Sequence, residues 1–558
     1  MKNIPIGEVL KEYGYITEAQ LQQALAKQEE SQVKKRLGEV LVDLGYVTEY
    51  QVLTALGERL KIPLYDLSKE PIDTDAVCKI PKQLAAKYCL IAISAAQGHL
   101  MVAVNDPLNF YAIEDIRQVT NMPLSLVLSE KNRIINAIDY YYSEICARQV
   151  TEDINDAAEE LGTLQEEAVE HDDDAAPVVR LVNSLLLRGH STNASDIHVE
   201  PFEFQTTVRM RIDGMMVKYV TLAASLHVSI IARIKIMANL DITEKRAPQD
   251  GHFRIRLEGV EINMRVSVIP TVYGEKAVLR FLSSDALIDR SGHFGMDTDN
   301  YEKLCKMLRS PHGIIYLTGP TGSGKTTTLY MALERLVEQP VNIATIEDPV
   351  ERNITGISQV QVNPLAGVTF ESGLRALLRQ DPDVIMVGET RDAETATISV
   401  RAAITGHLVL STLHTNDAVS TVVRLEDMGL PAYLVANSLV GVVAQRLVRK
   451  ICSNCGETYE PSLDEQQAAG LMIKQSRRGA GCHICNNTGY KGRIAIHEVL
   501  MMDKTVRRMV TEGRSSEELY AYAKEHQHMI SLKDSVQKLV EAGVTTLEEM
   551  IRTTYYAD

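Results

Sequence analysis

The residues whose types and spacing most directly indicate chemistry form a glycine-rich run that ends in a lysine and a threonine. The run is Gly319-Pro320-Thr321-Gly322-Ser323-Gly324-Lys325-Thr326, which fits the pattern G-x-x-x-x-G-K-[ST], and Thr327 follows it. An apolar stretch precedes the run and a helix-like stretch follows, as a phosphate-binding loop requires. The glycines let backbone N–H groups surround phosphates, Lys325 reaches the β and γ oxygens, and Thr326 can bind Mg²⁺. Residues 319–327 are therefore predicted to bind a nucleotide; a glycine-rich turn without a ligand is the alternative.

Two acidic clusters are predicted to meet this loop, because each follows an apolar strand. Residues 384–387 lead to Glu389, and residues 342–346 lead to Glu347. Parallel strands present their carboxyl ends to a nucleotide crevice, so one carboxylate can hold Mg²⁺ or its water and the other can orient the attacking water. Thr326 and Glu389 are the candidate magnesium ligands, although the pattern leaves the division of roles open. His414 ends a third strand and either contacts the γ-phosphate or has a structural role.

Four of the eight cysteines form two C-x-x-C pairs separated by 26 residues. These are Cys452, Cys455, Cys482 and Cys485. Four thiolates from two tight turns suit tetrahedral Zn²⁺, and a site whose four positions are all filled by protein is structural. A disulfide or free thiols are the alternatives, since the gap is longer than usual. The remaining cysteines are predicted to be small core residues: Cys78, Cys89, Cys146 and Cys305.

Composition excludes several classes of protein. The chain has 558 residues, 58 Lys+Arg against 74 Asp+Glu, a net charge of −16 and 45% hydrophobic residues. Packed cores are therefore expected, and a general nucleic-acid binder, which needs a basic surface, is not. No stretch approaches the ~20 apolar residues of a membrane helix. With no apolar signal core near Met1 and few cysteines, a cytoplasmic setting is expected.

The elements that must position these residues follow from repeats and periodicity. Residues 1–60 contain two copies of one motif at a shift of 31, in which a short helix ends at Gly14 or Gly45 and a second begins at a capping box, Thr17 or Thr48. Residues 207–214 and 261–268 alternate apolar and polar residues, which predicts half-buried strands with Arg265 on the polar face. From residue 314, buried strands alternate with helices, which is typical of a parallel sheet covered on both faces.

The predicted organisation is α/β with seven segments. Between Glu152 and Asp174 there are 11 Asp or Glu and no Lys or Arg, so this stretch is predicted to be a solvated linker. The segments are a helical repeat (1–60), a small α/β unit (61–145), the acidic linker (146–175), an α+β sheet domain (176–295), a P-loop domain (296–450), a tetracysteine zinc module (451–500) and a C-terminal helical domain (501–558).

Taken together, these motifs resemble the secretion ATPase superfamily of type II secretion and type IV pilus assembly. The resemblance rests on Ser310-Pro311-His312-Gly313, the acidic box 345–351, residues 374–392, the histidine box 405–416 and Gly492-Arg493 before Glu498. It also includes residues 195–201 and 245–251 upstream, so it covers nearly the whole chain. A strand that ends in glutamate, as here at Glu389, is the form that this family uses.

The resemblance implies that residues 296–450 form a RecA-like ATPase domain. It also implies a homohexamer in which ATP lies between this domain and the preceding sheet domain, with Arg265 and Arg280 on its phosphates. It implies an ATPase on the inner face of the cell membrane that works with an inner-membrane platform protein and a docking protein. The tetracysteine insert favours pilus extension over retraction, with type II secretion as the alternative. The repeat resembles a domain that binds cyclic di-GMP: Arg36-Leu37-Gly38 is retained, whereas Gly7 follows Pro5-Ile6. Helical docking onto an inner-membrane complex is the alternative function of this repeat, or an added one.

Two other functions remain as alternatives. A ring ATPase that moves nucleic acid would use the zinc module for contact, but the near-neutral charge of the folded parts disfavours it. A nucleotide sensor without turnover would switch a partner, but two carboxylates beside an intact P-loop disfavour that function. No nucleic-acid partner is therefore expected.

Overall fold

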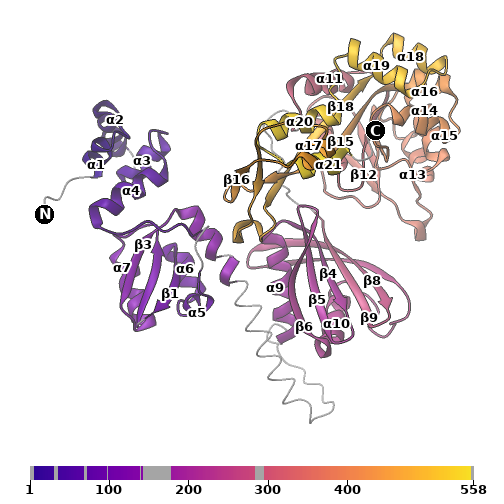
Figure 1. Ribbon diagram of the computed structural model, residues 1–558. Helices are drawn as coiled ribbons and strands as arrows, with labels where there is room; N and C mark the ends of the chain where they lie inside the picture. The colour runs from indigo at the N-terminus through magenta and orange to yellow at the C-terminus, as the bar shows by residue number, and fades with distance from the viewer. Residues whose placement is uncertain are drawn as a thin grey trace.

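The computed structural model describes residues 6–30, 36–67, 72–96, 98–138, 140–142, 177–282 and 295–554 (Figure 1). The predicted acidic linker, residues 146–175, and Cys146 lie outside the described residues. None of the helices in these ranges is both long and apolar enough to cross a membrane.

The N-terminal repeat folds as two helical hairpins, drawn in indigo in Figure 1. They are α1 (Ile6–Glu12) with α2 (Glu18–Glu30), and α3 (Leu37–Asp43) with α4 (Glu49–Leu60). The predicted stops and caps are confirmed: Gly14 and Gly45 both have φ of 70°, and Thr48 accepts a hydrogen bond from the Gln51 N–H. The hairpins share a small core that includes Leu10, Leu41 and Ala55.

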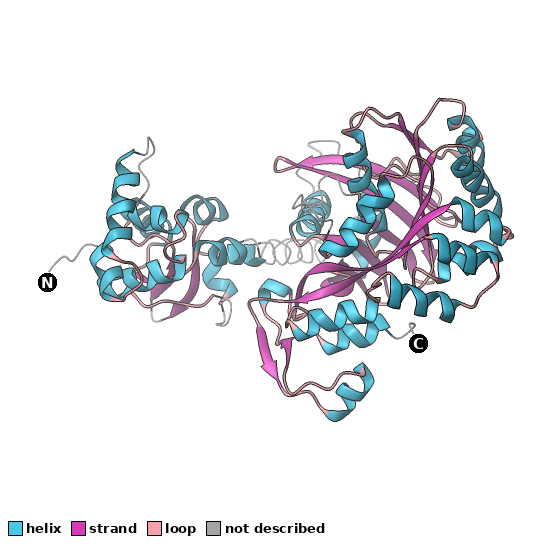
Figure 2. Cartoon of the chain, turned by 90° about the horizontal axis from the view of Figure 1, so that it is seen from above, coloured by secondary structure: helices cyan, strands magenta, loops and turns pink. Residues whose placement is uncertain are grey.

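A small three-stranded sheet follows. Its strands are β1 (Leu90–Ala96), β2 (His99–Val104) and β3 (Leu124–Leu128), in the order β1-β2-β3. Helices α5 (Thr74–Val77), α6 (Lys82–Tyr88) and α7 (Phe110–Thr120) accompany the sheet. In Figure 2 this unit and the helical repeat lie together, apart from the two larger sheets.

The six-stranded sheet is antiparallel and has the order β6-β5-β4-β9-β8-β7. Its strands are β4 (Ala194–Pro201), β5 (Gln205–Ile212), β6 (Met215–Ala223), β7 (Gln249–Leu257), β8 (Val260–Thr271) and β9 (Gly274–Phe281). Helices α9 (Pro177–Ser191) and α10 (His227–Met237) share its apolar core, while Arg265 is exposed as the alternation predicted. In the register of this sheet, Arg265 on β8 lies directly opposite Arg280 on β9.

The seven-stranded sheet has the order β12-β11-β13-β14-β10-β15-β18, and only the β15–β18 pair is antiparallel. Its strands are β10 (Gly313–Thr318), β11 (Ile343–Glu347), β12 (Ser358–Gln361), β13 (Val384–Val387), β14 (Leu408–Leu413), β15 (Leu439–Ile451) and β18 (Tyr490–Met501). Every residue of β10, β11, β13 and β14 is buried, as expected for a parallel sheet covered on both faces.

Two helical layers cover this sheet. Helices α11 (Thr298–Leu308) and α12 (Lys325–Val337) share one core cluster with its strands. The other cluster includes α13 (Phe370–Leu377), α14 (Ala393–Ile404), α15 (Ser420–Asp427) and α16 (Ala432–Ser438). It continues into the C-terminal helices α18 (Lys504–Thr511), α19 (Ser516–His526), α20 (Leu532–Glu541) and α21 (Leu547–Thr554).

The tetracysteine segment is inserted between the antiparallel strands β15 and β18. It contains the hairpin β16 (Gly456–Tyr459) and β17 (Ser476–Gly479), with α17 (Leu463–Ala469) between them. Of the cysteines predicted to be core residues, Cys305 is buried, but Cys78 is exposed and Cys89 is only partly buried. That prediction is wrong for Cys78, because it is the C-cap residue of a short helix and lies exposed at the edge of the core, whereas Cys89 packs against the core although it is only partly buried.

Candidate functional site

The glycine-rich loop connects the carboxyl end of β10 to the amino end of α12, as predicted. Gly319, Gly322 and Gly324 have φ of 142°, 78° and 86°, which side chains other than glycine rarely adopt. A Cβ atom on Gly319 would lie 2.3 Å from the Gln445 carbonyl oxygen. Gln445 on β15 also donates to the Ser323 carbonyl oxygen at 2.8 Å, so this strand supports the loop from behind.

Lys325 is the most constrained residue of the loop. Its side chain donates to the carbonyl oxygens of Gly319 at 2.7 Å and Pro320 at 3.1 Å. Burial lowers its pKa to about 8, and the nearby Glu389 opposes that shift. A bound phosphate would favour the charged amine.

The structure separates the two predicted carboxylates. Glu389, after β13, is partly buried beside Arg391 and acts electrostatically on Lys325 and His414. Glu347, at the end of β11, is 3% exposed and is already hydrogen-bonded by Thr345 at 2.6 Å and by Tyr330 of α12. Glu389 is thus the carboxylate placed at the phosphate loop, and Glu347 is held inside the strand layer.

Glu351 is a candidate that sequence reasoning did not assign. It follows β11 in the predicted acidic box, and its backbone N–H donates to the Tyr330 hydroxyl at 3.0 Å. Burial raises its pKa, whereas the neighbouring Arg280 and Arg265 lower it. The arginine pair of the six-stranded sheet therefore lies close enough to act electrostatically on Glu351. Its position in the same acidic box was the only signal in the sequence.

The arginine pair differs in its anchoring. The Arg280 Nε lies 2.7 Å from the Oδ1 of Asp196, a buried residue of β4. The Arg280 side chain is nevertheless 60% exposed. Arg265 is exposed on the neighbouring strand. One guanidinium is thus held in place by a buried carboxylate, and both remain accessible to an anionic ligand.

His414 lies beyond the end of β14, close to the loop. Burial and the nearby Lys325 lower its pKa, which favours the neutral imidazole, and its hydrogen bond with the Gly319 backbone opposes the shift. The hydroxyl of the next residue, Thr415, forms a 2.6 Å hydrogen bond with the hydroxyl of Thr318 on β10. This contact connects the histidine segment to the strand that precedes the phosphate loop.

A cleft of about 610 Å³ lies beside the phosphate loop. The loop and α12 contribute Gly324 and Thr327 to its lining, and Arg188 of α9 and Asp213 after β5 also line it. Asp213 accepts a hydrogen bond from the Gly492 N–H at 2.7 Å, which joins the two sheets at this point. The cleft has the volume expected for a small-molecule site between domains.

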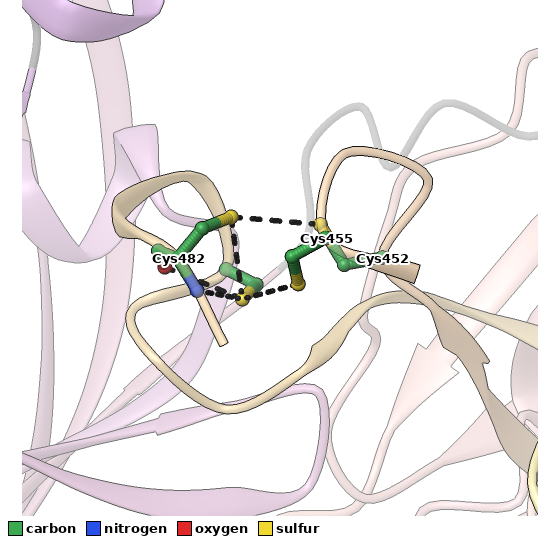
Figure 3. A group of neighbouring side chains, drawn as sticks. Cys452, Cys455 and Cys482 are labelled. Carbon is green, nitrogen blue, oxygen red and sulfur yellow. Dashed lines mark hydrogen bonds between the residues drawn. The ribbon is translucent and has the colours of Figure 1, made fainter. Parts of the chain in front are cut away.

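The four cysteines of the two C-x-x-C pairs meet in one cluster with their sulfur atoms turned toward one another (Figure 3). The Sγ–Sγ distances are 3.9 Å for Cys452–Cys482, 3.8 Å for Cys455–Cys485 and 3.7 Å for Cys482–Cys485. A tetrahedron with Zn–S bonds of about 2.3 Å has edges of about 3.8 Å, so the donor set fits Zn²⁺. The Asn454 amide and the Gly489 N–H also donate to these sulfurs, at 3.2 and 3.3 Å, as donors do around metal-bound thiolates.

The Arg36-Leu37-Gly38 motif lies at the start of α3. The Arg36 guanidinium forms an ion pair with Asp106 of the small α/β unit. A Cβ on Gly38 would lie 2.8 Å from Val52, and one on Gly7 would lie 2.6 Å from Leu21. Close packing of the hairpins therefore accounts for both glycines without a ligand.

Comparisons with known proteins agree with this architecture. The sequence matches the family described as "Type II/IV secretion system protein" over residues 171–552 and an MshEN domain over residues 60–145. The chain belongs to the type II/IV secretion ATPase family. It is an ATPase, as the phosphate loop predicted.

Relatives within the family carry two kinds of name. The type IV pilus assembly ATPase PilB of Myxococcus xanthus is 40% identical and matches over 98% of both chains. The type II secretion system protein HxcR of Pseudomonas aeruginosa is 44% identical over 80% of this chain and 92% of its own. Among solved structures, the ATPase DotB of Legionella pneumophila has a TM-score of 0.51 at 22% identity and covers 70% of this chain and 98% of its own, so it supports the fold.

Proposed function

We propose that this chain is a cytoplasmic motor for type IV pilus extension, which binds at the inner face of the cell membrane and acts on an inner-membrane platform protein and a docking protein. The observation that carries this proposal is the match to a pilus assembly ATPase over 98% of both chains, which includes the N-terminal helical repeat. The match to HxcR spans 80% of this chain at higher identity, so a type II secretion motor is the second candidate.

In the proposed cycle, ATP is the substrate and each chain of a homohexamer holds one nucleotide at residues 319–327. Lys325 leaves the Gly319 and Pro320 carbonyls for the β and γ oxygens. Thr326 and Glu389 would hold Mg²⁺, which neutralises developing phosphate charge. Glu347 or Glu351 orients the attacking water, and His414 hydrogen-bonds the γ-phosphate.

Arg265 and Arg280 couple hydrolysis to movement in this proposal. Both guanidiniums lie on the six-stranded sheet, whereas the phosphate loop lies on the seven-stranded sheet. Closing the arginines on the γ-phosphate and releasing them after hydrolysis would rotate one sheet domain against the other. Cys452, Cys455, Cys482 and Cys485 would hold a structural Zn²⁺ that stabilises the β15–β18 connection.

Cyclic di-GMP at Gly7, Arg36, Leu37 and Gly38 stays a prediction. Because Arg36 already pairs with Asp106, the ligand would have to replace that carboxylate. Titration calorimetry with the full-length protein tests this prediction: heat that is lost in Arg36→Ala supports it, and no heat at high micromolar ligand leaves docking as the role of the repeat.

Deletion of the gene tests the cellular function. Loss of surface pili with normal protein secretion, restored by the wild-type chain but not by Lys325→Ala, is the expected result. Normal pili with lost secretion would instead assign the chain to type II secretion. DNA- or RNA-stimulated ATPase activity with steep salt dependence would favour a nucleic-acid translocase over both.

A further inference from the structure

Strand β10 connects two cavities of different character. Its carboxyl end leads into the phosphate loop, and its first residue, Gly313, lines a second cavity of about 290 Å³. Six residues of strand place the two ends roughly 20 Å apart. The Ser310–Gly313 turn, which carried part of the family resemblance, lies at this second cavity, so its sequence is not explained by the nucleotide site.

The lining of this second cavity is cationic. It includes Lys306, Arg309, His312 and Arg507, together with the amide of Asn437, and no aspartate or glutamate. The chain as a whole has more acidic than basic residues, 74 against 58. We call this site the basic cavity. Its four basic side chains come from the end of α11, the turn before β10, and α18, so the fold brings them together.

Three of these basic side chains are not neutralised. Within the described ranges, the side chains of Lys306, Arg309 and His312 form no hydrogen bond or ion pair, whereas Lys303, one turn earlier on α11, pairs with Asp299 at 2.6 Å. Arg507 is fixed to the wall because its Nε donates to the Met502 carbonyl oxygen at 3.0 Å and its Nη1 donates to Ala436. One cation is thus positioned, and the others are available to a ligand.

We propose that the basic cavity binds a phosphate group of a ligand other than the catalytic nucleotide. A phosphate carries up to two charges and several acceptor oxygens, which two guanidiniums and an ammonium can match. The volume is near the lower limit of about 300 Å³ for small-molecule sites, so the phosphate-bearing part of the ligand is small. Two sources share this chemistry, a soluble phosphate compound and the headgroup of an anionic lipid.

Binding is tested on full-length protein saturated with ADP, so that the phosphate loop is filled. Pyrophosphate is titrated by calorimetry, and flotation is measured with phosphatidylglycerol and with phosphatidylcholine vesicles. The test variant is Lys306→Glu/Arg309→Glu. The matched control, Lys504→Glu/Arg508→Glu, makes the same change in charge at exposed positions of α18 that do not line the cavity. ATPase activity and melting temperature confirm that each variant folds.

The expected result is binding of pyrophosphate or of phosphatidylglycerol vesicles that weakens at least about tenfold in the test variant and stays unchanged in the control. Binding of pyrophosphate assigns a soluble ligand, and binding of vesicles alone assigns a lipid headgroup. The proposal is overturned if neither probe binds or if both variants weaken binding equally. It is also overturned if poly-glutamate binds the cavity while both phosphate probes fail.

Discussion

The parallel strands of the seven-stranded sheet and the antiparallel strands of the six-stranded sheet present functional side chains in different ways. In the parallel part, the phosphate loop, Glu389 and His414 all follow carboxyl strand ends, so they meet at one edge. In the six-stranded sheet, Arg265 and Arg280 lie side by side along a face. Strand ends thus gather residues from distant segments, whereas a strand face directs a group toward whatever domain packs against it.

The largest effect on turnover is expected at the parallel strand ends. Lys325→Ala and Glu389→Gln should lower kcat at least about 100-fold, because each removes a charge from the transferred phosphate or its metal. Steady-state phosphate release measures the effect. The matched control is Glu338→Gln, which replaces an exposed carboxylate at the end of α12 with a carboxamide and should keep wild-type turnover. Normal activity in either test variant would remove that residue from catalysis.

A smaller effect is expected on the antiparallel face. Arg265→Ala and Arg280→Ala should each lower kcat at least about tenfold while leaving nucleotide affinity within about threefold, because a guanidinium that meets the γ-phosphate acts mainly in the transition state. Turnover assays and binding of a fluorescent nucleotide separate the two quantities. Arg256→Ala, on the exposed surface of β7, is the control. Parallel losses of affinity and rate would contradict the coupling role of the pair.

The cysteine cluster extends the comparison to the segment inserted between β15 and β18. Metal analysis of the purified chain should give about one zinc per chain, and Cys482→Ser should lose the metal and lower the melting temperature while reducing turnover only a few-fold, because the site is structural. Cys78→Ser, at an exposed cysteine, should change neither property. A zinc-free protein with four free thiols would rule the metal out.

The smallest effect on turnover is expected at Glu498, where the property to measure is stability. Glu498 is a buried residue of β18 whose side chain accepts a hydrogen bond from the Ala418 N–H at 2.9 Å. Burial raises its pKa from 4.5 to about 7, so the fold favours the protonated acid. Its contribution to stability is present below pH 4.5 and is lost as the pH rises through about 7. Relative to Glu498→Gln, the wild type should lose up to about 3 kcal/mol of unfolding free energy across that window.

Denaturant unfolding at several pH values measures this difference. Glu512→Gln, an exposed exchange at the end of α18, should leave the pH dependence of the wild type unchanged. Identical pH profiles for the wild type and Glu498→Gln would show that Glu498 is not the group that titrates.

What the sequence predicted well is local. The phosphate loop, the capping boxes and the alternation that exposes Arg265 each depend on neighbouring residues, and the structure contains all three. The family, the ATPase activity and the RecA-like fold were also predicted correctly, because their motifs are spread over most of the chain.

What the sequence did not predict depends on contacts between segments. Glu351 gains its importance from arginines more than 70 positions earlier, on another sheet. The basic cavity combines residues 306–312 with Arg507, which no local pattern connects. The wrong prediction for Cys78 has the same origin, since residue type alone does not reveal where a short helix meets the edge of a core.

The most direct test of the central claim is a crystal structure of the full-length chain with Mg²⁺ and a non-hydrolysable ATP analogue. The phosphates should lie against the backbone amides of residues 319–326, with Lys325 moved from the Gly319 and Pro320 carbonyls to the β and γ oxygens. Arg265 and Arg280 should approach the γ-phosphate. Phosphates bound elsewhere, or Lys325 still on the two carbonyls beside a bound nucleotide, would contradict the account.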